Sequence, residues 1–112
     1  MEDSLVIIPT FNEIENIEAI IKAVFALEKK FHVLIVDDNS PDGTAYKVRE
    51  LQEQFQNRLF LEVRKEKSGL GTAYIHGFKW AIAHKYDFIF EMDADFSHRP
   101  DDLPRLYRAC IN

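Results

Sequence analysis

The sequence predicts a single α/β domain in which helices cover both faces of a mostly parallel sheet. Four short runs of β-branched and aromatic residues alternate with segments whose apolar residues recur at helical spacing, and this alternation favours a parallel sheet. Nearly every position of these runs is apolar, as in residues 33–36, which is typical of strands covered on both faces. A length of 112 residues, 46% of them hydrophobic, suffices for one domain and is too short for two ordinary ones.

The first unit is a strand followed by an amphipathic helix. Residues 5–8 form the strand, which we expect Pro9 to stop. Asn12 with Glu15 resembles a capping box at the start of the helix. The apolar residues of that helix are Ile14, Ile17, Ile20, Ile21, Val24 and Phe25.

The second unit repeats this pattern. Residues 32–36 form its strand, and the helix begins after Ser40, which can cap it, with Pro41 at the first helical position. The residues expected to face inward are Ala45, Val48, Leu51 and Phe55.

The third and fourth units complete the predicted sheet. Residues 59–63 form a strand that leads through a glycine-containing loop at residues 68–71 to a helix over residues 72–84. Residues 88–92 form the last strand, and a helix starts at Asp101. We expect these two helices to bury Ala73, Phe78, Ala81, Ile82, Leu103, Leu106, Tyr107 and the thiol of Cys110.

The loops that follow the strands are expected to share one edge of the sheet. In the strand order 3-2-1-4, the first and fourth strands are neighbours and their carboxyl ends form a topological switch point, where ligands bind. Residues 9–13, 37–44 and 93–97 all open on that edge. This edge is therefore the predicted binding site.

Asp93 and Asp95 follow the fourth strand within two residues of each other. Two carboxylates this close repel each other unless a cation compensates. Mg²⁺ or Mn²⁺ is usually bound through one or two carboxylates together with substrate phosphates. A strand-end turn with an acid as cap is the simpler alternative, and the mutual repulsion leads us to favour a metal.

A second acidic segment starts with Asp37 and Asp38. It matches the start of an EF-hand loop only superficially, because Arg49 stands where the bidentate Glu belongs and a strand precedes it. What remains is a strand-end carboxylate available to a base or ribose, followed by a helix start that favours anions. A turn without ligand explains Ser40 and Gly43 well, but it does not explain two adjacent aspartates.

Other candidate motifs are weaker. Gly69 and Gly71 form only a fragment of a dinucleotide fingerprint and follow the third strand rather than the first. They favour a close approach of the backbone to a ligand, or a tight turn before the helix, over NAD binding. Among the four histidines only His98, three residues past Asp95, lies where it can touch a substrate.

Charge and hydropathy exclude two classes of protein. Nineteen acidic and fourteen basic residues give a formal net charge of -5, which repels nucleic acid in the absence of a segregated basic face. No segment approaches the roughly 18 consecutive apolar residues of a spanning helix, and residues 1–4 lack the basic start of a signal peptide. We expect a soluble, unprocessed chain that binds no nucleic acid.

Four motifs occur in order and together carry a resemblance to a known family. They are PTFNE at residues 9–13, DDNSPDGT at 37–44, GLGTAYIHG at 69–77 and MDADFSH at 92–98. The set resembles the amino-terminal half of a family 2 glycosyltransferase, within it the dolichol-phosphate (polyprenyl-phosphate) mannosyltransferases. The resemblance implies a GT-A fold with a Rossmann-like sheet, of which residues 1–112 are the nucleotide-sugar-binding part, truncated at the C-terminus.

The same resemblance implies an enzyme that transfers mannose from GDP-mannose to a polyprenyl phosphate, with inversion at the anomeric carbon. The residues implied to bind the nucleotide are Pro9, Phe11, Glu13, Val36, Asp38 and Asp93. Asp38 is implied to contact the base and Asp93 the ribose. An acceptor phosphate is already anionic at neutral pH, so the reaction needs no general base of the kind a hydroxyl acceptor requires.

The resemblance also implies a Mg²⁺ or Mn²⁺ ion at the pyrophosphate. Its candidate ligands are Asp93, Asp95 and Ser97, and Asp95 is the candidate catalytic residue. The acceptor-binding half and its membrane-contacting helices are expected after residue 112, so we expect little activity from this chain alone. The full-length enzyme is expected in the cytoplasm, peripheral to the cytoplasmic face of a membrane.

Three alternatives stay open at this point. A family 2 transferase can use UDP-glucose or another donor in place of GDP-mannose. A non-catalytic receiver-like signalling module also groups aspartates at strand ends, although its acidic pair follows the first strand. The third alternative is a fragment that binds nucleotide without catalysis, or an incomplete domain that is stabilised by self-association through an unpaired sheet edge.

Overall fold

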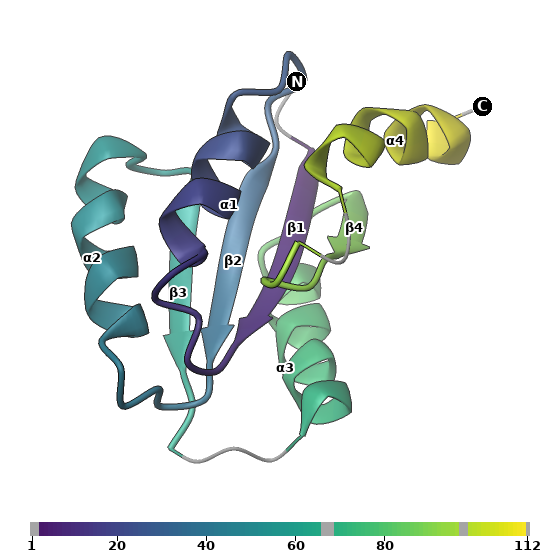
Figure 1. Ribbon diagram of the computed structural model, residues 1–112. Coiled ribbons are helices and arrows are strands. Elements are labelled where there is room, and N and C mark those ends of the chain that lie inside the picture. Colours follow the sequence, from purple (N-terminus) through teal and green to yellow (C-terminus); the bar gives the residue numbers. More distant parts are fainter. Residues whose placement is uncertain (1–2, 66–68, 97–98, 112) are drawn as a thin grey trace.

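The computed structural model describes residues 3–65, 69–96 and 99–111, and its centre is a four-stranded parallel sheet (Figure 1). The strands are β1 (Ser4–Thr10), β2 (His32–Asp37), β3 (Leu59–Val63) and β4 (Phe88–Glu91). They lie in the order β3-β2-β1-β4, and every neighbouring pair is parallel. The predicted sheet and strand order are confirmed.

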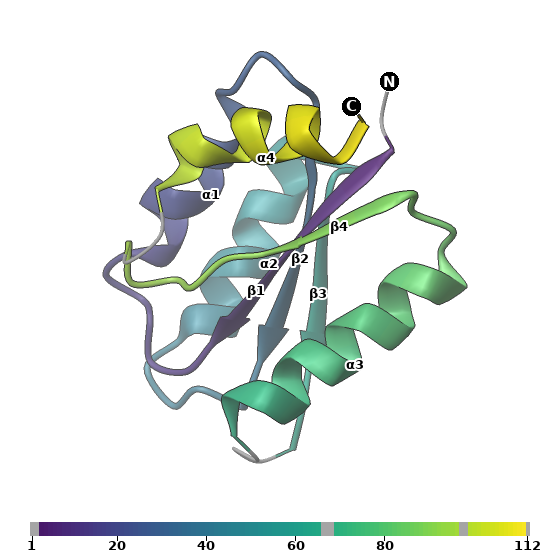
Figure 2. The same ribbon diagram turned by 90° about the vertical axis from the view of Figure 1, so that its right-hand side faces the viewer.

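The helices cover both faces of the sheet, as predicted. They are α1 (Ile17–Phe25), α2 (Thr44–Gln54), α3 (Leu70–Ala83) and α4 (Leu103–Ile111), the last preceded by a short 3₁₀ helix, η1 (Pro100–Asp102). Figure 2 shows α3 alone on one face, with α1, α2 and α4 on the other. In the described part of the chain, no helix is long and apolar enough to cross a membrane.

The sheet separates two apolar cores, because successive strand side chains point to opposite faces. The core under α1, α2 and α4 includes Val6, Ile8, Ile20, Val33, Ile35, Val48, Phe90 and Leu103. The core under α3 includes Leu5, Ile7, Leu34, Val36, Ala73 and Ala81. All seven residues of β1 are buried, which explains why residues 5–9 are apolar without alternation.

Pro9 does not stop the first strand, so that prediction is wrong. It pairs in register with Val36 of β2. Two residues earlier, the Ile7 carbonyl accepts a hydrogen bond from the Met92 amide at 3.0 Å, on the β4 side. In a parallel strand, every second residue directs its backbone N–H and C=O groups to the same neighbouring strand. The position of the missing N–H of Pro9 is therefore on the β4 side, beyond the end of β4. The proline therefore costs the sheet no hydrogen bond.

The predicted capping box at the first helix is also wrong. Asn12 adopts a left-handed φ of 57°, and α1 begins only at Ile17, after Asn16. The Glu13 carbonyl accepts the amides of both Asn16 and Ile17, at 3.0 and 2.9 Å. A tight turn thus occupies the segment where Asn12 and Glu15 were expected to start a helix.

The second helix likewise begins later than predicted. α2 starts at Thr44, after Gly43, whose φ of 92° suits glycine. Ser40 does not cap it, because its hydroxyl instead donates to the Asp37 carboxylate at 2.7 Å. The segment from residue 38 to residue 43 is therefore loop, available to shape the edge of the sheet.

Three residues predicted to be buried on the last two helices are exposed. Ala73 and Ala81 of α3 are buried as expected, but Ile82 is 68% exposed, because one step along a helix turns a side chain by about 100°. Leu103 anchors the start of α4, whereas Leu106 is 39% exposed. Cys110 is exposed as well, so the expectation of a packed thiol is wrong.

We predict that Gly77→Ala destabilises the fold. A Cβ at Gly77 would lie 2.6 Å from Cγ2 of Ile7, a fully buried, β-branched side chain of β1 that has little room to move. Such overpacking costs about 1–3 kcal/mol, which urea unfolding can measure. Gly71→Ala on the same helix is the matched control, since a Cβ there meets nothing within 4 Å. Equal unfolding free energies for the two variants would contradict the prediction.

Asp3 ties the start of β1 to two other parts of the chain. Its carboxylate accepts hydrogen bonds from Lys29 at 2.7 Å, Ser4 at 2.8 Å and Tyr107 of α4 at 3.0 Å. Burial by itself raises the pKa of Asp3, but these hydrogen bonds outweigh it and lower the pKa from 3.8 to about 2. The charged form of Asp3 therefore stabilises the fold.

We predict that this contribution depends on pH. Because the folded-state pKa lies below the unfolded one, the stabilisation is complete above pH 3.8 and is lost as the pH falls to about 2. The shift corresponds to about 2 kcal/mol. Asp3→Asn should therefore lower the unfolding free energy at neutral pH and have much less effect near pH 2. An equal loss at both pH values would show that the charge of Asp3 does not matter.

Candidate functional site

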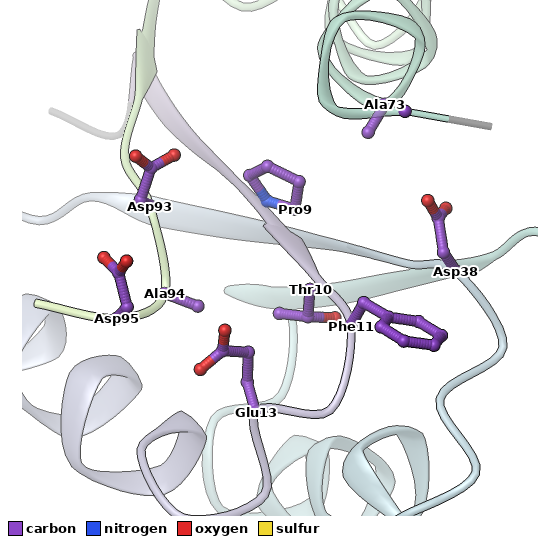
Figure 3. Close-up of a pocket in the computed structure, with 10 residues that line it drawn as sticks. Pro9, Thr10, Phe11, Glu13, Asp38, Ala73, Asp93, Ala94 and Asp95 are labelled. Carbon is purple, nitrogen blue, oxygen red and sulfur yellow. The ribbon is translucent and has the colours of Figure 1, made fainter. Parts of the chain in front are cut away.

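A pocket of about 290 Å³ opens at the carboxyl ends of β1, β2 and β4. The residues that line it are Pro9, Thr10, Phe11, Glu13, Asp38, Gly69, Ala73, Asp93, Ala94 and Asp95. Figure 3 shows Asp93 and Asp95 at one end with Glu13 facing them, and Asp38 at the other end beside Phe11. The pocket therefore has an acidic end and a second end marked by Asp38.

Each of the three loops around the pocket turns at a residue with a left-handed backbone. Asn12 follows β1 and has φ 57°, Asn39 follows β2 and has φ 57°, and Phe96 follows β4 and has φ 64°. Asparagine tolerates this conformation, whereas it is strained for a bulky residue such as Phe96. The residues directly before these turns are Phe11, Asp38 and Asp95, and all three line the pocket.

Asp37 holds the first two loops together from inside the protein. It is fully buried, and its carboxylate accepts hydrogen bonds from the Thr10 hydroxyl at 2.6 Å and from the Ser40 amide and hydroxyl at 2.9 and 2.7 Å. Asp37 therefore has a structural function, and only its neighbour Asp38 reaches the pocket. This explains why the sequence has two adjacent aspartates.

Side chains of the β2–α2 loop and of the first residue of α2 accept hydrogen bonds from backbone amides of the β1–α1 loop. The bonds run from Asn12 N to Ser40 Oγ at 2.9 Å, from Glu13 N to Thr44 Oγ1 at 3.1 Å and from Ile14 N to Asp42 Oδ2 at 3.1 Å. Burial by itself raises the pKa of Asp42, but hydrogen bonds from Thr44 and Ile14 outweigh it and lower the pKa. These bonds fix the position of Phe11 and Glu13 at the pocket.

Asp38 forms a two-pronged ion pair with Arg64. The Nε and a terminal nitrogen of the guanidinium lie 2.6 and 2.8 Å from the two carboxylate oxygens. Arg64 also donates to the Thr72 hydroxyl at 3.1 Å and to the Gly69 carbonyl at 3.4 Å, both at the start of α3. The sequence analysis did not single out Arg64, which fixes Asp38 in a defined orientation.

The acidic end of the pocket concentrates negative charge. Burial raises the pKa of Glu13, a hydrogen bond with Asn16 opposes this, and the charges of Asp95, Asp42 and Asp93 raise it further. The carboxylates therefore repel one another across the pocket. A divalent cation at this end would relieve that repulsion.

The donor set at this end fits a hard divalent cation that shares its coordination with a ligand. Asp93 and Asp95 offer carboxylate oxygens from one loop. Over residues 3–65, 69–96 and 99–111, no group of three or more His, Cys, Asp and Glu side chains is arranged to hold a metal without help. Mg²⁺ and Mn²⁺ sites of the kind completed by phosphate oxygens need only one or two carboxylates.

Tyr74 of α3 reaches the same end of the pocket. Its hydroxyl donates a hydrogen bond to Asp93 Oδ1 at 2.8 Å. Burial, and then the hydrogen bond and charge of Asp93, raise the pKa of Tyr74 above its ordinary value of 10.0, so the hydroxyl stays protonated and acts as the donor. The sequence analysis placed Tyr74 in the GLGTAYIHG motif but gave it no function.

The structure brings together six of the predicted site residues, namely Pro9, Phe11, Glu13, Asp38, Asp93 and Asp95. Val36 is fully buried in the core under α3 and is not among the residues that line the pocket. Ser97 and His98 lie outside the described residues. The roles assigned to all of these residues remain predictions.

Comparison with protein families and curated proteins gives matches over almost the whole chain. The model of glycosyl transferase family 2 matches residues 5–111. The polyprenol monophosphomannose synthase of Mycolicibacterium smegmatis is 45% identical over 95% of this chain and 40% of its own length. The undecaprenyl-phosphate mannosyltransferase of Micrococcus luteus is 44% identical over 94% of this chain and 43% of its own length.

A solved structure is similar in fold and carries ligands. It is the mannosyltransferase PcManGT from Pyrobaculum calidifontis in complex with GDP-Man and Mn²⁺, with a TM-score of 0.66 and 28% identity. The similarity covers 70% of this chain and 24% of that one. The chain thus spans less than half the length of each of these proteins.

We predict that Asp37→Ala lowers the unfolding free energy by about 3 kcal/mol. The substitution leaves three donors at a buried position without their acceptor, and each unsatisfied group costs about 1–3 kcal/mol. Urea unfolding measures the loss. Asp101→Ala, which removes a carboxylate whose side chain is 78% exposed, is the control. If the two variants lose the same stability, Asp37 does not hold the loops together.

Proposed function

Because the chain belongs to glycosyltransferase family 2, we propose that it binds a nucleotide sugar and a divalent cation in the pocket at the strand ends. The proposed nucleotide sugar is GDP-mannose and the proposed cation is Mg²⁺ or Mn²⁺. The proposed activity of the whole enzyme is transfer of mannose from GDP-mannose to a polyprenyl phosphate. The chain supplies the donor-binding half of that enzyme.

The observation that carries this proposal is the two-ended pocket. A nucleotide sugar has a neutral, hydrogen-bonding base at one end and an anionic diphosphate farther along, between the ribose and the sugar. The distribution of Asp38 and of the Asp93–Asp95 pair in the pocket matches this polarity. The names of a polyprenol monophosphomannose synthase and an undecaprenyl-phosphate mannosyltransferase, at 45% and 44% identity, support mannose as the sugar. A similar structure in complex with GDP-Man and Mn²⁺ supports the choice of nucleotide.

At the Asp38 end, the proposed ligand is the guanine base. A carboxylate accepts hydrogen bonds from N–H groups. The ion pair with Arg64 holds the Asp38 carboxylate in place. Phe11 and Pro9 line the same pocket and offer apolar surface to the nucleoside. Glu13, which faces Asp93 and Asp95, is proposed to contact the nucleotide.

At the acidic end, Asp93 and Asp95 are proposed to hold the cation with the diphosphate. The cation, when bound, supplies charge neutralisation for the departing diphosphate. Asp95 lies in an exposed turn directly before the strained Phe96. In this turn Asp95 lines the pocket. Ser97 was the third candidate ligand, but it lies outside the described residues.

In the proposed reaction a phosphate oxygen of the lipid forms a bond to the anomeric carbon of mannose. The bond from that carbon to the β-phosphate oxygen of GDP breaks, and the electron pair leaves with GDP. The configuration at the anomeric carbon inverts. The attacking phosphate needs no general base, so the residues of this chain have only to bind, orient and neutralise the donor.

Family membership decides only one of the alternatives that the sequence left open. Membership of family 2 rules out a receiver-like signalling module. A UDP-sugar donor remains the competitor within the family, and Asp38 alone does not exclude it, because uracil also offers an N–H group. Contact of the full-length enzyme with the cytoplasmic face of a membrane and self-association of this chain stay as proposals.

We predict that the chain binds GDP more tightly with Mn²⁺ than with a chelator, and that Asp95→Asn removes most of this difference. The loss of one carboxylate ligand should weaken Mn²⁺-dependent binding at least about tenfold, or about 1.4 kcal/mol. Isothermal titration calorimetry of GDP and UDP, each with Mn²⁺ and with EDTA, measures both quantities.

Asp101→Asn, at an exposed position of η1, is the matched control and should bind like the wild type. Tighter binding of UDP than of GDP would overturn the proposed donor. The absence of any Mn²⁺ effect in the wild type would overturn the proposed cation site.

A further inference from the structure

The start of α3 lies along the pocket and touches both of its ends. Ala73 lines the pocket and is almost fully buried. Thr72, one residue earlier, accepts a hydrogen bond from Arg64, which holds Asp38. Tyr74, one residue later, donates to Asp93. Neighbouring residues of one helical turn are thus linked to the opposite ends of the site.

The helix that carries Tyr74 is firmly seated on the sheet. Ala73 and Ala81 are buried against the sheet, and Gly77 lets the helix backbone approach Ile7 so closely that no Cβ fits between them. The ring of Tyr74 packs against the same core. The hydroxyl of Tyr74 is therefore presented from a fixed position.

The acid that Tyr74 contacts belongs to a much less regular segment. β4 ends at Glu91, and the Met92 amide still donates a hydrogen bond to the Ile7 carbonyl of β1. Asp93 follows immediately, and the chain then turns through the strained Phe96. The hydrogen bond from Tyr74 thus connects a rigid helix to the irregular loop that carries the acidic pair.

From this geometry we propose that Tyr74 is a positioning residue that orients the Asp93 carboxylate for the cation and the diphosphate. The inference rests on the proposed function, since it concerns the same site. The phenol ring contributes packing, and the hydroxyl contributes orientation. Groups that hydrogen-bond to metal ligands commonly tune metal affinity in this way.

A purely structural role is the competing explanation, and the two differ in what they predict. If the hydroxyl only adds stability, its removal lowers the melting temperature and changes GDP binding equally with and without metal. If it positions Asp93, its removal weakens only the metal-dependent part of binding. Tyr74→Phe tests this because it keeps the ring and removes only the hydroxyl.

The experiment is calorimetric titration of the 112-residue chain with GDP, in Mn²⁺ and in EDTA, for the wild type, Tyr74→Phe, Asp93→Asn and the double variant. Tyr46→Phe is the matched control, because Tyr46 is 73% exposed on α2 and does not line the pocket. Circular dichroism establishes that each variant is folded. Electron paramagnetic resonance of Mn²⁺ measures metal binding directly in the presence of GDP.

We expect Tyr74→Phe to weaken Mn²⁺-dependent binding about tenfold and to leave binding in EDTA unchanged. In the Asp93→Asn background the same substitution should have no further effect on Mn²⁺-dependent binding, because the hydroxyl acts through Asp93. Tyr46→Phe should bind like the wild type.

Three results would overturn the inference. One is Mn²⁺-dependent binding by Tyr74→Phe that equals that of the wild type, and another is an equal loss in Mn²⁺ and in EDTA. Additive losses in the double variant would show that Tyr74 does not act through Asp93. In all three cases the wild type still responds to Mn²⁺, and the proposed function stands. A wild type without any response to Mn²⁺ would instead overturn both.

Discussion

The parallel pairing of β1 between β2 and β4 is the constraint on which the site depends. Because the three strands run in the same direction, their carboxyl ends meet at one edge, and the loops that follow them face a common pocket. Each loop turns back at a left-handed residue, and the preceding side chain is directed inward. Pro9 is compatible with this arrangement only because β4 is shorter than β1.

The acidic residues at this edge divide into supports and ligands. The carboxylates of Asp37 and Asp42 accept hydrogen bonds from hydroxyl and amide groups around the edge of the sheet. These bonds fix the shape of the loops that surround the pocket. Asp38, Asp93 and Asp95 face the pocket. Arg64 and Tyr74 hold two of these three side chains, and side chains held in a fixed orientation reduce the entropic cost of binding a ligand.

The sequence predicts the architecture well because strand runs such as residues 33–36 are apolar throughout and alternate with helical patterns. It mispredicts the starts of α1 and α2, because Ser40 and Asn12 serve contacts between loops, and such contacts leave no local periodicity. The pocket residues Asp38, Asp93 and Asp95 could be predicted from their places at strand ends. Arg64 and Tyr74 could not, because their partners are 26 and 19 residues away along the chain, and only the fold brings them together.

The central claim is that loops from β1, β2 and β4 form one site in which a cation binds beside a nucleoside diphosphate. Paramagnetic broadening in the NMR spectrum of the ¹⁵N-labelled chain tests it most directly, by comparing amide signals with GDP and Mg²⁺ before and after traces of Mn²⁺ are added. The account predicts the strongest broadening at residues 93–96 and 11–13, and weaker broadening near Asp38. Broadening centred on Asp101 and Asp102, or spread evenly over exposed carboxylates, would contradict it.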